Sequence, residues 1–324
     1  MARVAIVIVT YNSALEIGGC LESLRHQPDA EVVVVDNASM DGTQDVVRQF
    51  GARLIANSCN AGFAGGVNIG TRATDAPLVL LLNPDAHLRT DVEAMIRAFR
   101  SEEKPPVGVV GGMLTDETGE PQTGFMVRSL PTPAALCFEV LGINRLWPGN
   151  PVNWHYRCMN KNPMTPGLAE QPAGAFLMFS RKTWFDVGGF DERFMPVWFE
   201  DVDFCARVRN AGYRILYEPA SMASHSGGHS VNALPAGNRY NYWYGNLLKY
   251  AARHFGIIEF RVVCAAVALG AFLRAVGETP RGGFRAFRTY GVVFRHACLQ
   301  FFSSRKQAAT ADGQRCVKSG SREN

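Results

Sequence analysis

Short apolar runs alternate with amphipathic stretches over the first hundred residues. Four runs rich in β-branched residues predict buried strands at 3–10, 31–36, 52–56 and 77–83. Apolar residues recur at helical spacing at 13–26, 42–50, 63–73 and 90–100, with Ser13 and Thr90 as the expected N-caps of the first and last. Strands that alternate with helices predict parallel βαβ units and a doubly wound sheet.

The pattern changes after residue 107. A strand and hairpin are expected at 107–126, further strands at 173–180 and 213–218, and helices at 201–210 and 238–255. Residues 130–168 are rich in Pro, Asn and aromatic side chains, which predicts a long loop over a site.

Polar side chains follow three of the predicted strands at the point where each strand ends. They are Thr10 and Asn12, then Asp36, then Asn83 and Asp85. In doubly wound sheets ligands bind outside the carboxyl ends of the strands, so these side chains are candidates for a binding site. Asp36 at a strand end suits a pyrimidine N–H, and a turn cap is the alternative.

The composition is that of a globular protein, with 47% hydrophobic and 19% charged residues. The net charge of +4 argues against a nucleic-acid-binding protein. The eight cysteines form no CxxC pair and no zinc-type cluster. The apolar run at 4–9 is too short for a signal peptide, so we expect a cytoplasmic protein.

The C-terminal part of the chain is basic and apolar. Residues 253–306 hold nine Lys or Arg against two Glu, and residues 262–273 form a run of twelve apolar positions. Twelve is fewer than the roughly 20 residues needed to cross a bilayer. Such a segment suits an anionic membrane surface, and a soluble helical cap on the catalytic domain is the alternative.

Three further segments carry candidate chemistry. The glycines of 60–70 (NAGFAGGVNIG) permit close approach to a ligand at a helix start, or form a simple turn. Glu200, Asp201 and Asp203 bring three carboxylates together beside Trp198. Such crowding of like charges next to apolar side chains is expected to raise carboxylate pKa values. The alternative is a helix N-terminus that is simply rich in acidic residues. His225, on a Gly-rich loop, is a candidate metal ligand, and a surface or core histidine is the alternative.

The order of these segments is more informative than any one of them. Six segments follow one another over residues 3–230: TYN, VVDNASMDGT, NAGFAGGVNIG, LLLNPD, EDVDF with Arg207 and Gly212-Tyr213, and HSGGHS. Together they resemble family 2 glycosyltransferases of the GT-A fold, and bacterial rhamnosyltransferases of polysaccharide assembly among them. The resemblance implies an α/β GT-A catalytic domain with a doubly wound mixed sheet at 1–235, divided into a nucleotide-sugar half at about 1–112 and an acceptor half at about 113–235. A helical segment at 236–306 and a disordered tail at 307–324 follow.

The resemblance also implies a role for each site residue. Asp201 takes the position of the catalytic base, and Asp85 and His225 those of the metal ligands, with His229 as a second histidine nearby. Asn83 stands where many relatives carry Asp. Trp198 and Glu200 are expected at the acceptor or the sugar. The expected nucleotide-sugar residues are Thr10, Asn12, Asp36, Asn60, Gly65, Asn68, Asn83 and Asp85.

The implied activity is inverting transfer of a sugar to a hydroxyl, with Mg²⁺ or Mn²⁺ as cofactor. The favoured donor is dTDP-L-rhamnose, and UDP-galactose, UDP-glucose and UDP-N-acetylglucosamine are alternatives. The expected acceptor is a saccharide or lipid-linked saccharide of cell-surface polysaccharide or O-antigen assembly, used at the inner face of the plasma membrane. A sugar-phosphate nucleotidyltransferase and a non-catalytic nucleotide-sugar binder are the alternatives from other classes.

Overall fold

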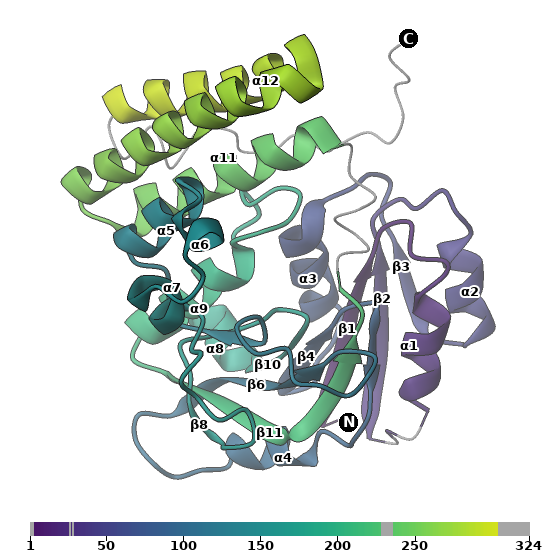
Figure 1. The fold of residues 1–324 in the computed structure, drawn as a ribbon. Coiled ribbons are helices and arrows are strands. Elements are labelled where there is room, and N and C mark those ends of the chain that lie inside the picture. The colour runs from purple at the N-terminus through teal and green to yellow at the C-terminus, as the bar shows by residue number, and fades with distance from the viewer. Residues whose placement is uncertain (1–2, 26, 28, 228–235, 304–324) are drawn as a thin grey trace.

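The computed structural model describes residues 3–25, 27, 29–227 and 236–303, except the side chains of 236–237 and 279–286. In this part of the chain, one sheet has the strand order β3-β2-β1-β4-β10-β6-β11-β5, with β8 paired to β11 (Figure 1). The strands are β1 (Val4–Thr10), β2 (Ala30–Asp36), β3 (Arg53–Ala56), β4 (Leu78–Leu82), β5 (Ala86–Leu88), β6 (Val107–Thr115), β8 (Gly167–Leu168), β10 (Phe176–Ser180) and β11 (Arg214–His225).

The sheet is mixed, as the GT-A resemblance implies. Strands β3, β2, β1 and β4 are parallel, and their apolar residues are mostly buried. Strand β10 runs antiparallel to β4 and β6, and β11 is parallel to β6. The register of β1 on β2 places Thr10 opposite Asp36, so the polar ends of these two strands meet at one edge.

The glycines of the 60–70 segment pack a helix closely on the sheet. In α3 (Gly62–Arg72), a Cβ on Gly66 would lie 2.5 Å from Val9, and one on Gly70 would lie 2.5 Å from Val7. Neither position has room for a larger side chain. The sequence predicts that these glycines let a ligand approach the backbone closely. At Gly66 and Gly70 it is strand β1 that approaches closely instead.

Two predicted helix starts are displaced. Helix α1 (Ile17–Ser23) begins after a turn in which the carbonyl of Ser13 accepts from the backbone N–H of Ile17, so Ser13 is not its N-cap. Helix α4 (Glu93–Ala98) likewise begins after Thr90, and Asp91 accepts from the backbone N–H of Glu93. Helix α2 (Thr43–Gln49) lies within its predicted range.

The prediction of a long loop at 130–168 is wrong, because this stretch folds into short helices. They are α5 (Pro133–Val140), α6 (Ile143–Leu146) and α7 (Pro151–Tyr156). Thr132 accepts from the backbone N–H of Ala135 at 3.1 Å and Asn150 from that of Asn153 at 2.8 Å. Each cap is followed by proline at the first helical position, where its missing N–H costs nothing.

The buried apolar side chains form two clusters. The first surrounds the sheet, and the second joins α5 to three later helices, α9 (Glu200–Asn210), α11 (Ala236–His254) and α12 (Ile257–Phe302). Helix α9 belongs to both, with Phe204 in the first cluster and Val202 in the second. The helix that carries Asp201 is therefore held between the sheet and the helical segment. A further short helix, α8 (Arg181–Asp186), follows β10.

Helix α12 folds back on itself. Arg261 near its start lies over the ring of Phe301 near its end, at 5.9 Å, whereas 40 residues of straight helix would span about 60 Å. Figure 1 shows two arms of this helix beside α11. The first arm, Ile257–Glu278, is long and apolar enough to cross a membrane, which corrects the expectation drawn from the twelve-residue run. This criterion rests on length and composition alone, and the core helix of a soluble protein also meets it; 44% of the most apolar window is buried in the structure.

Candidate active site

A cavity of about 510 Å³ joins the sheet edge, the start of α9 and the helical segment. The sheet edge contributes Asn83, Pro84 and Asp85 after β4, and His225 at the end of β11. Residues 173–175, which precede β10, and 197–202 form a second side of the cavity. The helices contribute Leu136, Glu139, Tyr156, Arg157 and Trp243.

Asp201, the second residue of α9, is partly exposed to this cavity. Its Oδ2 accepts from the backbone N–H of Gly174 at 3.0 Å and from the Gln171 amide at 3.2 Å, and its Oδ1 accepts from the N–H of Val202 at 2.8 Å. A Cβ on Gly174 would lie 3.1 Å from that of Asp201, so this approach favours glycine. Burial raises the pKa of Asp201, and the hydrogen bonds and the charge of Arg128 oppose the rise.

Glu200 lines the same cavity but is only 4% exposed. Its Oε2 has no hydrogen-bond partner among the residues that the structure describes. Burial and the neighbouring Asp201 raise the pKa of Glu200 well above its ordinary value. The protonated carboxyl is thus favoured, and it can donate a hydrogen bond into the cavity.

The turn before α9 is strained and is held by another helix. Trp198 and Phe199 have φ angles of +81° and +73°, a region that costs a non-glycine residue on the order of 1–3 kcal/mol. The Asn246 amide of α11 donates to the carbonyls of Met195, Val197 and Trp198 at 3.2, 2.9 and 3.2 Å. Asn246 is 1% exposed, so its contacts are those of a buried, satisfied amide.

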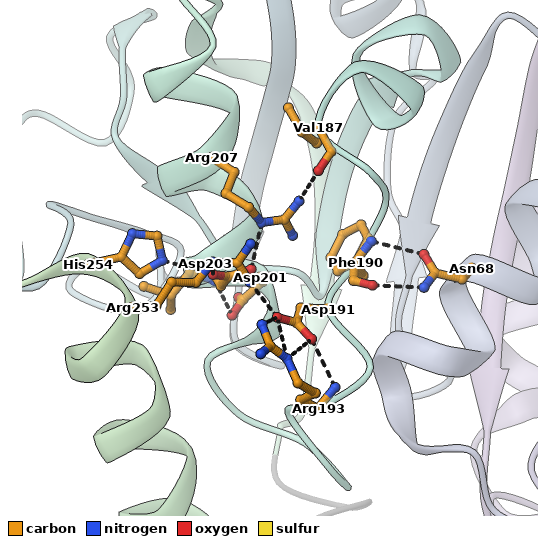
Figure 2. A network of polar contacts seen from close by, with 11 residues as sticks. Asn68, Val187, Phe190, Asp191, Arg193, Asp201, Asp203, Arg207, Arg253 and His254 are labelled. Carbon is orange, nitrogen blue, oxygen red and sulfur yellow. Dashed lines mark hydrogen bonds and ion pairs between the residues drawn. The ribbon is translucent and has the colours of Figure 1, made fainter. Parts of the chain in front are cut away.

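Asp203 is separated from the other two carboxylates. It is fully buried, accepts from Arg207 at 2.7 Å and contacts His254 of α11 at 2.8 Å and Arg253 at 3.4 Å (Figure 2). Arg253 also pairs with Asp191, which binds Arg193. This network ties α9 to α11 and to the 187–193 segment, so the role of Asp203 is structural.

Asp85 and His225 converge at the sheet edge. Their Oδ1 and Nε2 atoms are 3.4 Å apart, and each side chain is 4% exposed. His225 is the last residue of β11, not part of a loop as expected from the sequence, and it pairs with Ala86 of β5. That pairing places it beside Asp85. His229 lies outside the described residues.

The surroundings of His225 orient its ring. Its Nδ1 lies 3.3 Å from Oε1 of Gln122, and the ring stacks on Phe125 at 5.5 Å. Because an amide oxygen only accepts, it favours a proton on Nδ1 and leaves the Nε2 lone pair directed toward Asp85. Asn83 is also close, with its amide nitrogen 3.5 Å from Nε2. The described residues hold no cluster of three His, Cys, Asp or Glu that could bind a metal, so other ligands must complete such a site.

Thr10, Asn12 and Asp36 lie together at the ends of β1 and β2, and none of the three lines the cavity, whose lining includes Val9 of β1. Thr10 and Asp36 are fully buried, and the Thr10 hydroxyl donates to Asp36 at 2.8 Å. Asp36 also accepts from Gln44 and from the backbone N–H of Ser39, which makes it a turn cap. Asn12, at φ +52°, accepts from the N–H of Met40. The nucleotide roles of these residues stay predictions.

Asn60 and Gly65 lie at the start of α3. Asn60 accepts from the N–H of Gly62 at 2.8 Å, and a Cβ on Gly65 would lie 3.0 Å from that of Ala61. Asn68 is not brought to the cavity. Its amide exchanges hydrogen bonds with the backbone of Phe190 (Figure 2). Its oxygen also accepts from Trp184, so its polar atoms serve packing.

The sequence of the domain matches two family models. Residues 5–162 match the model described as glycosyl transferase family 2, and residues 155–226 match the one described as N-terminal domain of galactosyltransferase. The chain is a glycosyltransferase with a family 2 domain. The two models together extend from β1 through Asp85 and Asp201 to His225, the parts of the chain that form the sheet side of the cavity.

Individual relatives of this family 2 glycosyltransferase agree with that result. The N-acetylglucosaminyl-diphospho-decaprenol L-rhamnosyltransferase of Mycobacterium tuberculosis (strain H37Rv) is 28% identical over 271 residues, which cover 78% of this chain and 85% of the relative. The crystal structure of GalNAc-T7 with UDP, GalNAc and Mn²⁺ matches with a TM-score of 0.54 and 13% identity, over 95% of this chain and 56% of that one. Staphylococcus aureus TarS 1–349 in complex with UDP-GlcNAc matches with a TM-score of 0.51 and 14% identity, over 95% and 90%. At these identities the two structures show the shared GT-A fold alone.

Several residues of the glycosyltransferase site carry no sequence signal. Gln122 and Phe125 fall in the predicted hairpin and Gly174 in the predicted strand at 173–180, but these patterns do not place them beside His225 or Asp201, which only the folded chain does. Asn246 lies on a predicted helix, but only the fold shows that it contacts the 195–198 turn. Arg128 and Tyr156 fall in or beside the stretch that was expected to be a loop.

Proposed function

We propose that the chain transfers a sugar from a nucleoside-diphosphate donor to an acceptor hydroxyl in one displacement that inverts the anomeric carbon. The observation that carries the proposal is that one cavity is lined both by Asp201 and by the pair Asp85 and His225. A base and a binding point for the leaving diphosphate are the two elements that such a displacement requires.

Asp201 acts as the base. Its raised pKa makes the carboxylate a better proton acceptor than an exposed aspartate, and the hydrogen bonds from Gly174 and Val202 fix its direction. It removes the proton of the acceptor hydroxyl as the oxygen attacks the anomeric carbon. Glu200, from its buried position, donates to a hydroxyl of the acceptor or the sugar, and Trp198 supplies an apolar face.

Asp85 and His225 would hold a divalent cation, Mg²⁺ or Mn²⁺. The carboxylate and the Nε2 lone pair converge, and the two ligands that the described residues supply would leave positions for phosphate oxygens. When bound there, such an ion would supply positive charge to stabilise the departing diphosphate. The fold shared with GalNAc-T7, solved with UDP and Mn²⁺, supports this assignment.

We assign the nucleotide to the carboxyl ends of β1 and β2, where Thr10, Asn12 and Asp36 meet. The proposed nucleotide site also includes Asn60 and Gly65 at the start of α3 and Asn83 after β4. Asn68, within α3, anchors that helix by its hydrogen bond to the carbonyl of Phe190. The favoured donor is dTDP-L-rhamnose, because the Mycobacterium tuberculosis relative is named a rhamnosyltransferase. UDP-galactose, UDP-glucose and UDP-N-acetylglucosamine are alternatives, the last being the ligand of the TarS complex.

The acceptor that we propose is a saccharide linked to a lipid through a diphosphate, of the class in the name of the same relative. Its use would place the enzyme in the assembly of cell-surface polysaccharide such as O-antigen, in the cytoplasm at the inner face of the plasma membrane. Six apolar side chains along the first arm of α12 recur at helical spacing and are each more than half exposed: Ile258, Val262, Leu269, Phe272, Leu273 and Val276. A stripe of this kind suits an anionic membrane surface, with Arg261 at its edge for lipid phosphates.

A donor panel tests the activity. The purified full chain is incubated with Mn²⁺ and each of the four nucleotide sugars, thermal stability is measured, and transfer to a synthetic lipid-linked saccharide is followed. We expect dTDP-L-rhamnose to stabilise the protein most, because a ligand that binds only the folded state raises its stability. NMR of the product should show an inverted anomeric configuration. Retention of configuration, or transfer from none of the donors, would contradict the proposal.

A further inference from the structure

Arg128 is a cation on the wall of the cavity with unused hydrogen-bonding capacity. It ends β7 (Val127–Arg128), which pairs with β9 (Gln171–Pro172), and its Nε donates to the carbonyl of Gly124 at 2.8 Å. In the described part of the chain, its two terminal NH₂ groups have neither a hydrogen bond nor a carboxylate partner. Four N–H donors of one guanidinium are therefore available to a ligand.

The guanidinium is held in place by aromatic rings. It lies 5.6 Å from the ring centre of Phe125 and 5.9 Å from that of Tyr156. Phe125 in turn stacks on His225. Because Arg128 is already restrained by these contacts, a ligand that binds it loses less side-chain freedom than it would at an exposed arginine.

Arg128 faces the region between the base and the helical segment. Its charge acts on Asp201, and its neighbour Gln171 across the β7–β9 ladder donates to Asp201. Tyr156 belongs to α7, and the adjoining wall is formed by Glu139 of α5 and Trp243 of α11. The other arginine on this wall, Arg157, lies 3.9 Å from Glu139 and donates to Asn153, so its charge is already paired.

We infer that Arg128 binds the diphosphate of the acceptor, one sugar ring away from the hydroxyl that Asp201 activates. This inference rests on the proposed function. A planar guanidinium with two free NH₂ groups matches two phosphate oxygens, and charge-assisted bonds of this kind are strong. The donor diphosphate is assigned to Asp85 and His225, so the second diphosphate of the reaction needs a cation elsewhere in the cavity. Arg128 is that cation, and it selects acceptors that are glycosyl diphosphates over neutral glycosides.

The experiment compares two acceptors that share one saccharide. The first is the saccharide on a diphosphate with a short alkyl chain, and the second is its neutral alkyl glycoside. The variants are Arg128→Gln, Arg128→Lys and the matched control Arg97→Gln, which removes an exposed arginine on α4. For Arg128→Gln, the ratio of kcat/KM between the diphosphate and the neutral acceptor should fall about tenfold to a hundredfold. Arg128→Lys should recover part of the ratio, and Arg97→Gln should leave it unchanged.

The outcomes separate this inference from its alternatives. An unchanged ratio with reduced activity on both acceptors would show that Arg128 acts only through Asp201 or through folding. A raised KM for the donor with an unchanged acceptor ratio would assign Arg128 to the donor diphosphate. A wild-type enzyme that prefers the neutral glycoside would also overturn the inference. Failure of the proposed function is distinct from all of these, because the wild-type protein would then transfer no sugar to either acceptor.

Discussion

Asn246 of α11 donates its amide to the carbonyl of Trp198 at 3.2 Å, a contact between the helical segment and the left-handed turn that begins α9. The same amide nitrogen reaches Met195 and Val197, so one buried side chain holds three carbonyls of that turn. The helical segment is thus part of the scaffold of the active site, whatever else it binds.

Replacing Asn246 by alanine should destabilise the protein and slow transfer. The three carbonyls lose a buried donor, for which we expect a decrease in the free energy of unfolding of about 1–3 kcal/mol. Because the turn positions Trp198, Glu200 and Asp201, kcat should fall while the KM for the donor changes little. Chemical denaturation and steady-state kinetics measure both, with Asn238→Ala, an exposed asparagine on the same helix, as the control. An unchanged kcat in a folded but destabilised variant would show that the contact serves stability alone.

Glu200 should make the protein less stable as the pH rises. Its folded-state pKa lies above its unfolded-state pKa of about 4.3. The contribution of the protonated Glu200 carboxyl to the free energy of unfolding is therefore fully present below the unfolded-state pKa. It is lost as the pH rises through the folded-state pKa. Glu200→Gln removes this titration, so the decline of the unfolding free energy as the pH rises above the unfolded-state pKa should become shallower.

Denaturation at several pH values checks this prediction, with the exposed Glu117→Gln as the control. Part of the decline should persist in Glu200→Gln, since burial raises the pKa of Asp201 in the same direction. Identical pH dependence in Glu200→Gln and the wild type would mean that Glu200 is charged in the folded protein.

The metal assignment predicts a dependence on Gln122, which contacts His225 but is not one of the proposed ligands. EDTA should abolish transfer, and Mg²⁺ or Mn²⁺ should restore it. Gln122→Ala removes the acceptor at Nδ1 of His225, and the Mn²⁺ concentration for half-maximal activity should rise about tenfold to a hundredfold. Titration of Mn²⁺ into the chelated enzyme measures this, with the exposed Gln49→Ala as the control. Full activity in EDTA would rule out the role of Asp85 and His225.

The exposed stripe on α12 predicts binding to anionic vesicles. Leu269→Ser, Phe272→Ser and Leu273→Ser together should reduce co-sedimentation with phosphatidylglycerol vesicles, because they remove apolar area without touching the buried side of the helix. Leu15→Ser, at a residue 90% exposed outside the helical segment, is the control. Truncation of α12 would be a poorer test, since Phe260 and Val263 belong to the buried core. Equal sedimentation of the triple variant and the wild type would favour a soluble cap.

The sequence predicts the sheet well because its strands are continuous apolar runs. Strands β1, β2 and β4 lie within one residue of their expected bounds. Thr10 and Asp36, expected at two strand ends, are opposite each other in the register of β1 on β2. The missed helices α5 and α7 are short, and their signal lies in the caps Thr132-Pro133 and Asn150-Pro151 rather than in periodicity. A search for a capping residue followed by proline finds both.

The site is only partly predictable, for a physical reason. Asp85 follows a predicted strand and Asp201 begins a predicted helix, so their place in the fold can be predicted from the sequence, whereas His225, expected on a loop, ends β11 instead. Gln122, Arg128 and Asn246 reach the site through tertiary packing, and no local pattern encodes that. The structural role of Asp203 likewise depends on its contacts with Arg253 and His254, which lie on a helix about fifty residues away in the sequence.

The role of Asp201 is the central claim, and the Asp201→Asn variant tests it most directly. The amide keeps the size of the side chain but cannot accept the proton of the acceptor hydroxyl. Steady-state kinetics with saturating donor should show kcat reduced by about a hundredfold to ten-thousandfold, with donor binding by calorimetry within about twofold of the wild type. Near-wild-type kcat in this variant would contradict the assignment of Asp201 as the catalytic base.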